Sequence, residues 1–237
     1  MKKKKEKNFF VSNYSQSWDF IKESKNFIYA TILVFFITFL FGFFFSLPEL
    51  ITNQILEFIQ ELLEKTKGMS QFELTRLIFL NNIKSSFVVL VFGMVLGIYP
   101  VMATIANGFI LGFVASIAVG SEGFFVLWRI FPHGIFELPA IFISFGLGLK
   151  LGLWLIMGPI KFYWKENKLV LILFILFYLP TFILTLIYNH RFRSKMKKSF
   201  LEFKLNFMNS LKVFLFIILP LLIIAAIIEG GLIFLFS

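Results

Sequence analysis

Long runs without a charged residue alternate along this chain with short polar segments. The longest charge-free runs cover residues 27–47, 85–121 and 169–189. Residues 27–47 would rise about 31 Å as an α-helix, enough to cross the hydrocarbon core of a bilayer. The pattern predicts transmembrane helices over 27–47, about 83–105, from about 107 onward, 169–189 and 213–236. Asn107-Gly108 is a turn signal and is expected to separate the second span from the third.

The segment 49–82 has the pattern of an amphipathic helix. Apolar residues recur at helical spacing and glutamates occupy other positions (Ile51, Ile55, Phe58, Ile59 and Leu62; Glu57, Glu61 and Glu64). Gly68 is expected to end this helix, and Ser70 with Glu73 forms a capping-box signature for the next one. This segment is either a connector packed on its own bundle, a helix on the outer membrane surface, or a docking surface for a partner.

The composition places the chain among integral membrane proteins. Hydrophobic residues make up 59% and charged residues 15%, against roughly 25% charged in soluble domains. The predicted fold is an all-α polytopic membrane bundle of about 5–6 spans. We expect residues 1–26 to form a basic cytoplasmic arm with an interfacial helix near Tyr14–Lys25. Residues 27–237 are expected to form one transmembrane domain with an extracytoplasmic amphipathic insertion at about 49–82.

The net charge of +10 is concentrated in two clusters that flank apolar runs. One cluster comprises Lys2–Lys5 and Lys7, and the other lies within residues 191–198. Such clusters are typical of the cytoplasmic flanks of spans and attract anionic lipids. The expected partners are therefore membrane lipids and no nucleic acid. The expected location is the cell membrane, multi-pass, with a cytoplasmic N-terminus.

The chain has no cysteine and only two histidines, His133 and His190. This excludes disulfides, thiolate metal sites and a three-histidine centre within one chain. We expect no metal and no cofactor, and the chain carries no evident nucleophile for a catalytic role.

Residues 131–140 place a histidine and a carboxylate four residues apart within a very apolar region. An ionisable side chain at membrane depth is costly and indicates a functional site. In a helix, His133 and Glu137 would share one face. Arg129, Glu229 and Asn107 are the further residues expected to contribute to this intramembrane polar site. One interpretation of Glu229 makes it a partner for Arg129 or Lys150 across the bundle.

Pro132, Gly134 and Pro139 indicate a break in the helix around this site. The basic loop 191–198 should lie on the same side as the N-terminus, which would place 161–168 on the opposite side if 169–189 crosses once. Residues 121–160 would then begin and end outside. A re-entrant segment or two broken half-helices around Pro132–Pro139 satisfies this condition, whereas the alternative is that the positive-inside rule fails for one loop.

The segment Pro132-His133-Gly134-Ile135-Phe136-Glu137-Leu138-Pro139-Ala140, followed by Gly146-Leu147-Gly148-Leu149-Lys150-Leu151-Gly152, resembles the signature of the stage II sporulation protein M family. Asn81-Asn82 and 107–112 also resemble that family. The resemblance implies a multi-span membrane protein. In sporulating bacteria the family member anchors a peptidoglycan-degrading complex during engulfment, and relatives occur in organisms that do not sporulate.

Three interpretations of His133 and Glu137 remain open. They form a structural hydrogen-bonded pair, a proton or ion site of a transporter, or a general acid–base pair. We favour a membrane scaffold or partner-anchoring protein linked to cell-envelope remodelling, with a protein partner or a homo-oligomer. The alternative is a small-solute or ion transporter with its polar site at His133 and Glu137.

Overall fold

The computed structural model describes residues 9–45, 48–166, 180, 184–185 and 187–236. Side chains at a few further positions, including 128–133 and 155–166, lie outside the description. The described residues form α-helices with short 3₁₀ and π segments and no strand. Five of the described helices are long and apolar enough to cross a membrane, which confirms the predicted helical membrane class.

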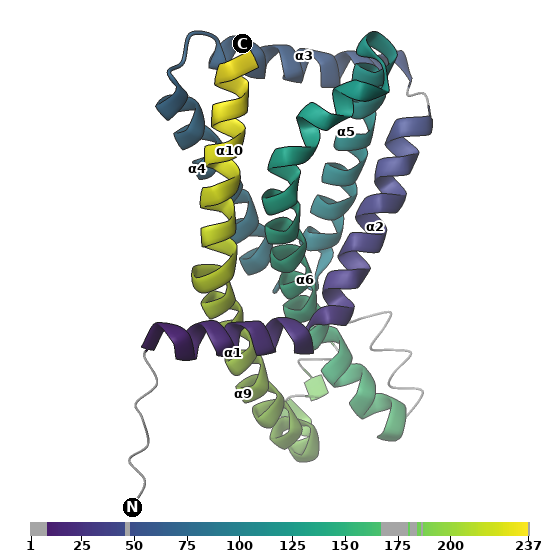
Figure 1. Cartoon of the computed structure of the whole chain (residues 1–237). Coiled ribbons are helices and arrows are strands. Elements are labelled where there is room, and N and C mark those ends of the chain that lie inside the picture. Colours follow the sequence, from purple (N-terminus) through teal and green to yellow (C-terminus); the bar gives the residue numbers. More distant parts are fainter. Residues whose placement is uncertain (1–8, 46–47, 167–179, 181–183, 186, 237) are drawn as a thin grey trace, which may run out of the picture.

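Two helices meet at one end of the molecule, where the chain changes direction (Figure 1). α1 (Phe9–Glu23) runs across the foot of the bundle, and α2 (Lys25–Phe44) rises from it as the first candidate span. Ser24 is the single residue between them and is fully buried. The basic arm expected over 1–26 therefore contains a formed helix.

At the other end, α3 (Glu49–Thr66) lies across the tops of the spans (Figure 1). It is not packed extensively against any other described helix. α4 (Gln71–Phe92) then descends as the second candidate span. Ser70 and Glu73 form the predicted capping box: the Ser70 side chain accepts from the Glu73 backbone N–H, and the Glu73 carboxylate accepts from the Ser70 N–H at 2.8 Å.

The turn between the second and third spans lies at residues 93–97, and α5 covers Ile98–Glu122. The expected boundary at Asn107-Gly108 is wrong, because both residues lie inside α5. Leu96 and Gly97 take positive φ angles of 57° and 69°, which lets the chain reverse within five residues. Gly108 is instead a packing residue, since an added Cβ there would collide with the Phe35 carbonyl oxygen of α2.

After the short 3₁₀ segment η1 (Phe124–Val126), α6 (Leu127–Glu166) is one continuous helix. The break expected around Pro132, Gly134 and Pro139 is therefore wrong. A proline removes one helical hydrogen bond but its φ is compatible with a helix, so α6 bends in its upper part without breaking (Figure 1). Residues 134–154 form a candidate span.

This single crossing by α6 answers the question of how residues 121–160 cross the membrane. α6 ends at the same end of the bundle where α9 (His190–Val213) begins, as Figure 1 shows. Residues 121–160 therefore run from one end to the other, and no re-entrant segment is needed. The span expected over 169–189 lies almost entirely outside the described residues.

The last crossing is made by one long helical path. α9 continues through the π-helical turn η2 (Phe214–Ile218) into α10 (Leu219–Phe236). The span expected over 213–236 is thus the second part of a longer continuous helix that begins with α9. Phe214, Ile217 and Ile218 are buried at the π turn.

The centre of the bundle is α6, which packs against α2, α4, α5, α9 and α10. Its lower half approaches the α4–α5 turn backbone to backbone. An added Cβ at Gly152 would collide with backbone atoms of Gly93 and Gly97, and one at Gly148 would meet the Val89 carbonyl oxygen. Small residues at such spacing allow close helix contact, so this glycine series holds α6 against its neighbours.

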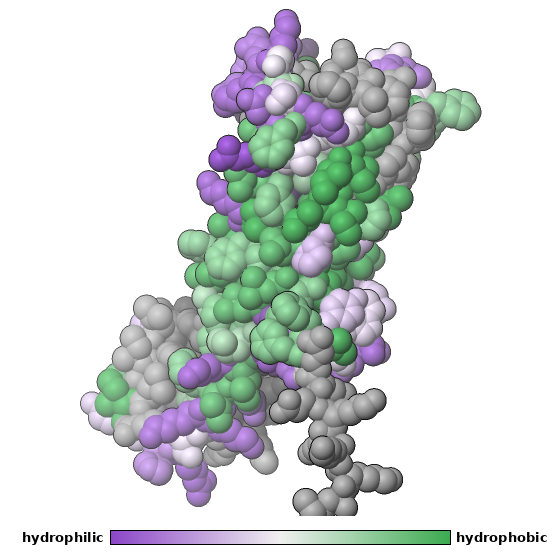
Figure 2. Space-filling view, turned by 60° about the vertical axis from the view of Figure 1, so that its left-hand side comes forward, coloured by the Kyte–Doolittle hydropathy of each residue, from purple (hydrophilic) through white to green (hydrophobic). Residues whose placement is uncertain are grey.

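Two chemically different ends border the apolar spans. Figure 2 shows hydrophobic residues over the middle of one face and hydrophilic residues at both ends. We call the end with α1 and α9 the basic end, because Lys22, Lys25 and the lysines of α9 lie there. We call the end with α3 the acidic end, because Glu57, Glu61 and Glu64 lie there.

Candidate functional site

Glu137 of α6 lies opposite Asn82 of α4 inside the bundle. Both side chains are partly buried, and the Asn82 side chain is close enough to the Glu137 carboxyl group to interact with it. The helical spacing explains why Glu137 points into the bundle, because it lies seven residues before the buried Ser144, on the same face of α6. The bundle thus supplies a polar partner to a carboxyl group that would otherwise be costly at this depth.

Glu229 of α10 adds a second carboxyl group to this site. It is close enough to Glu137 for the two charges to interact electrostatically. Its Oε2 atom is buried and has no hydrogen-bond partner among the described residues. Glu229 faces inward because it follows the buried Leu222 by seven residues and Ala226 by three. Three helices therefore bring Asn82, Glu137 and Glu229 together; we call these three residues the polar cluster.

The remaining residues expected at this site are His133, Arg129 and Asn107. The backbone of α6 places His133 and Arg129 one and two helical turns before Glu137, and their side chains lie outside the described part of the structure. Asn107 is not part of the polar cluster. Its side chain is on the exposed side of α5, where Nδ2 donates to the Ala103 carbonyl oxygen at 2.7 Å.

Lys150 was a candidate partner for Glu229 across the bundle, and the structure contradicts that pairing. Its Nζ donates to Ser24 Oγ at 2.8 Å, at the basic end. The same Nζ lies 3.9 Å from the centre of the Phe20 ring. The pairing fails because Lys150 is thirteen residues after Glu137 on α6, which separates the two by about 20 Å along the helix.

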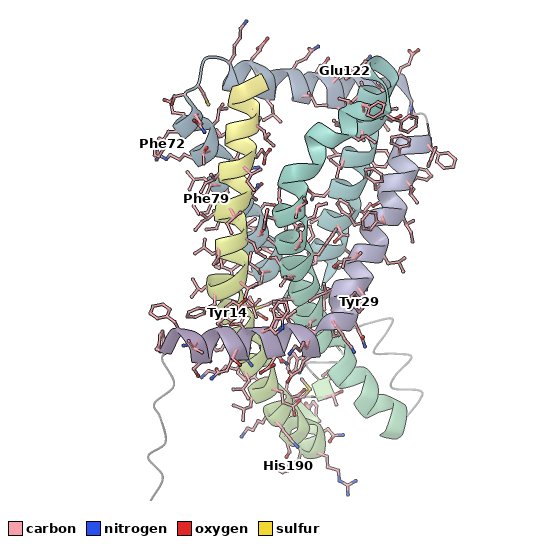
Figure 3. All side chains as sticks on the ribbon, viewed as in Figure 1. Tyr14, Tyr29, Phe72, Phe79, Glu122 and His190 are labelled. Atoms are coloured by element: carbon pink, nitrogen blue, oxygen red, sulfur yellow. The ribbon has the colours of Figure 1, made fainter. Side chains whose placement is uncertain are left out.

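Ser144 and His190 do not form catalytic arrangements among the described residues. Ser144 is fully buried and its Oγ donates to the Ser86 carbonyl oxygen at 2.6 Å, which links α6 to α4. His190 begins α9 at the basic end, far from Glu122 at the other end (Figure 3). The described residues contain no group of three histidine, aspartate or glutamate side chains that could hold a metal.

The reasoning from sequence did not place Asn82 at the site. A usable signal was present in the helical spacing of α4. Asn82 precedes the buried residues Ser86 and Val89 by four and seven positions, so it lies on the buried face of α4, whereas its neighbour Asn81 is exposed.

A family model supplies the identification of this architecture. The model described as stage II sporulation protein M matches residues 31–232, which includes all or most of every candidate span. The chain belongs to the stage II sporulation protein M family. The family resemblance seen in residues 132–152 is therefore confirmed, and it extends over most of the chain.

Membership in the stage II sporulation protein M family agrees with a multi-pass membrane protein. The match begins inside α2, so α1 and the joint at Ser24 precede it. No curated protein and no solved structure matches the chain. The role of the polar cluster in this family member must therefore be argued from its own residues.

Proposed function

We propose that this protein is an integral membrane scaffold that anchors a protein partner at its acidic end. The partner is one with a basic surface, and the setting is remodelling of the cell envelope. The observation that carries the proposal is the position of α3 across the tops of the spans, with little packing against the bundle and an acidic outer face.

The two faces of α3 have different exposure. Ile55 and Ile59 are partly buried, whereas Glu57, Glu61 and Glu64 are exposed. By their helical spacing, the three glutamates lie on the opposite side of α3 from the two isoleucines. Only Glu61 has a described ion pair within this stripe, with Lys65 Nζ at 2.7 Å. Three glutamates on one helix face provide charge complementarity for a basic partner.

The tight packing around α6 favours a scaffold function over a transporter function. α6 is held against the α4–α5 turn by backbone contacts at Gly148 and Gly152 that leave no room for an added Cβ. Packed interiors are rigid and resist gradual deformation. A rigid bundle with one weakly packed surface helix suits an anchoring role.

The experiment is affinity purification of the full chain from native membranes in mild detergent, with quantification of co-purifying proteins. We expect one stoichiometric partner whose recovery falls about tenfold in the triple variant E57Q/E61Q/E64Q, since surface charge pairs give roughly 0.2–1 kcal/mol each. The matched control changes uncharged exposed residues of the same helix, Asn53→Ser, Gln54→Ser and Gln60→Ser, and should retain the partner.

Two results would overturn the anchoring role. One is recovery of the chain alone, as a monomer or homo-oligomer. The other is a partner that the acidic-face variant binds as well as the control does. Sensitivity of the complex to salt should accompany the expected result, because exposed charges are screened over about 8–10 Å at physiological ionic strength.

A second candidate function is transport of a proton or small cation through the polar cluster. The observation in its favour is the buried Glu229 Oε2 atom beside the Glu137 carboxyl group. This Oε2 atom has no hydrogen-bond partner in the part of the chain that the structure describes. Flux measured in vesicles with Glu137→Gln tests it. Loss of coupled flux with normal folding would support transport, and absence of flux in the unaltered protein would exclude it.

A further inference from the structure

The joint between α1 and α2 is built so that α1 lies across the end of the bundle. Ser24 is the only residue between the two helices, and its Oγ donates to the Phe20 carbonyl oxygen at 2.8 Å. The Ser24 backbone N–H also bonds to the Phe20 carbonyl oxygen at 3.0 Å. The end of α1 is thereby closed by local hydrogen bonds before α2 begins in a new direction.

Lys150 of the central helix fixes this joint. Its Nζ donates to Ser24 Oγ at 2.8 Å and lies 3.9 Å from the Phe20 ring centre. Both contacts orient the same cation, one through a hydrogen bond and one through the face of an aromatic ring. The position of α1 is therefore set by α6, and α1 is not a loose terminal arm.

The remainder of α1 is held by the last helical path. Lys212 Nζ of α9 donates to Gln16 Oε1 at 3.0 Å. The rings of Phe9 and Phe10 each meet the Phe216 ring of the π turn edge-on, with centroids 6.4 Å apart. Contacts at both ends keep α1 lying across the foot of the bundle (Figure 1).

One apolar face of α1 is left without cover from the described part of the chain. Ser17 and Phe20 are buried against the bundle, whereas Val11, Tyr14 and Trp18 are 60%, 55% and 46% exposed. The spacing of these three residues places them in one stripe along the helix. Such a stripe beside a charged face is the pattern of a helix lying in a membrane interface.

The level of this stripe along the bundle matches a membrane surface. Figure 3 shows Tyr14 on α1 and Tyr29 in the second turn of α2 at about the same level of the bundle. Tyr29 is 63% exposed. Tyrosine and tryptophan gather at the level of lipid headgroups, because one part of each ring system is apolar and another is polar.

Lysines border the apolar stripe. Lys22 and Lys25 are exposed at the joint, and Lys2–Lys5 and Lys7 precede α1 in the sequence. The ion pair between Lys22 Nζ and Asp19 Oδ1 is 3.5 Å long, with side chains 64% and 65% exposed. A pair of this kind is weak and leaves the lysine free to contact another anion.

We propose that α1 is an interfacial helix that binds the anionic phospholipid surface of the leaflet at the basic end. The Val11–Tyr14–Trp18 stripe lies at the boundary between headgroups and acyl chains, and Lys22 and Lys25 contact anionic headgroups. Because the family match begins at residue 31, this lipid contact is a property of the residues that precede the matched region.

The depth of α1 tests the first half of the proposal. The chain has no cysteine, so single spin labels can be placed by Tyr14→Cys, Trp18→Cys, Ser15→Cys or Asp19→Cys. The full chain is reconstituted in nanodiscs of equal parts phosphatidylcholine and phosphatidylglycerol. Labels at 14 and 18 should be accessible to oxygen and labels at 15 and 19 to a water-soluble nickel chelate. Equal aqueous accessibility at all four positions would overturn the proposal.

The choice of lipid tests the second half. A fluorophore on Tyr14→Cys should be quenched at least about twofold more by brominated phosphatidylglycerol than by brominated phosphatidylcholine at the same mole fraction, because basic residues near the membrane surface attract anionic lipid. K22Q/K25Q should reduce this preference, while the matched pair K65Q/K67Q at the acidic end should not. Val11→Cys replaces Tyr14→Cys if the latter does not fold, and equal quenching by both lipids would contradict the proposal.

Discussion

Two amphipathic helices, α1 and α3, lie across opposite ends of the same bundle, and they are attached very differently. α1 is fixed by a lysine of the central helix, by a side-chain hydrogen bond from α9 and by aromatic contacts with the π turn. α3 has no extensive packing against another described helix. Their exposed faces also differ, since α1 presents aromatic residues and α3 presents glutamates.

The central helix shows the same difference between its two halves. Near the basic end, Gly148 and Gly152 bring α6 into backbone contact with its neighbours. Nearer the acidic end, Glu137 meets Asn82 and Glu229 through polar side chains. Close backbone packing thus holds the half of α6 near the basic end, and polar side chains meet in the half near the acidic end. This difference agrees with a basic end fixed in the membrane and an acidic end that binds a protein partner.

The largest effect is expected from closing the space at the basic half of α6. An alanine Cβ at Gly152 would collide with backbone atoms of Gly93 and Gly97, and backbone cannot move as a side chain can. We expect Gly152→Ala to destabilise the protein by about 2 kcal/mol or more. The measurement is the thermal unfolding midpoint in mild detergent.

Gly120 of α5 is the matched control for this change. Nothing lies within 4 Å of a Cβ added there. Gly120→Ala should leave the midpoint unchanged or raise it, because alanine favours a helix over glycine by up to about 1 kcal/mol. Equal loss in the two variants would show that the basic half does not depend on backbone contact.

A double-mutant cycle sharpens the description of the acidic half. At alkaline pH, Glu137→Gln and Glu229→Gln each remove the same repulsion between two carboxylates, so their effects on stability should not add. We expect a coupling free energy of roughly 0.5–3 kcal/mol, with the double variant gaining less than the sum of the singles. Additive effects would show that the Glu137 and Glu229 carboxyl groups do not interact.

A smaller effect is expected from Lys150→Met, which keeps much of the side-chain length but loses the hydrogen bond to Ser24 and the contact with the Phe20 ring. We expect a loss of about 1 kcal/mol and greater mobility of a spin label at Ser15 on α1. A label at Gln60 on α3 should not change. Unchanged mobility at Ser15 would mean that Lys150 does not hold α1.

The smallest effect concerns the Glu61–Lys65 pair on α3. The hydrogen bond and charge of Lys65 lower the pKa of Glu61 below its ordinary value of 4.5. A lowered folded pKa adds stability above 4.5, and that stability is lost as the pH falls through the folded pKa. Lys65→Gln should therefore slightly lower α3 helicity at neutral pH and have no effect in strong acid, as measured by circular dichroism difference spectra. An equal effect at both pH values would exclude the ion pair as its cause.

Local signals in the sequence predicted most of the individual helices. The charge-free run at 27–47 became α2, and Ser70 with Glu73 marked the start of α4 as expected. These signals depend on short-range geometry that the sequence contains directly.

Features that depend on tertiary context were predicted less well. Asn107-Gly108 has the chemistry of a turn, but tight packing of Gly108 on α2 keeps it inside α5. Pro132 and Pro139 suggested a break, but the helix continues through both. Glu137 and Glu229 were identified as intramembrane carboxylates, while the role of Asn82 required knowing which face of α4 meets α6.

The most direct test of the difference between the two ends is site-directed photocrosslinking in native membranes. A photoreactive residue is placed at Gln60 on the exposed face of α3 or at Tyr14 on the exposed face of α1. We expect one discrete protein adduct from position 60, lost with E57Q/E61Q/E64Q, and lipid adducts alone from position 14. A protein adduct from α1 together with lipid adducts alone from α3 would contradict the assignment of the two ends.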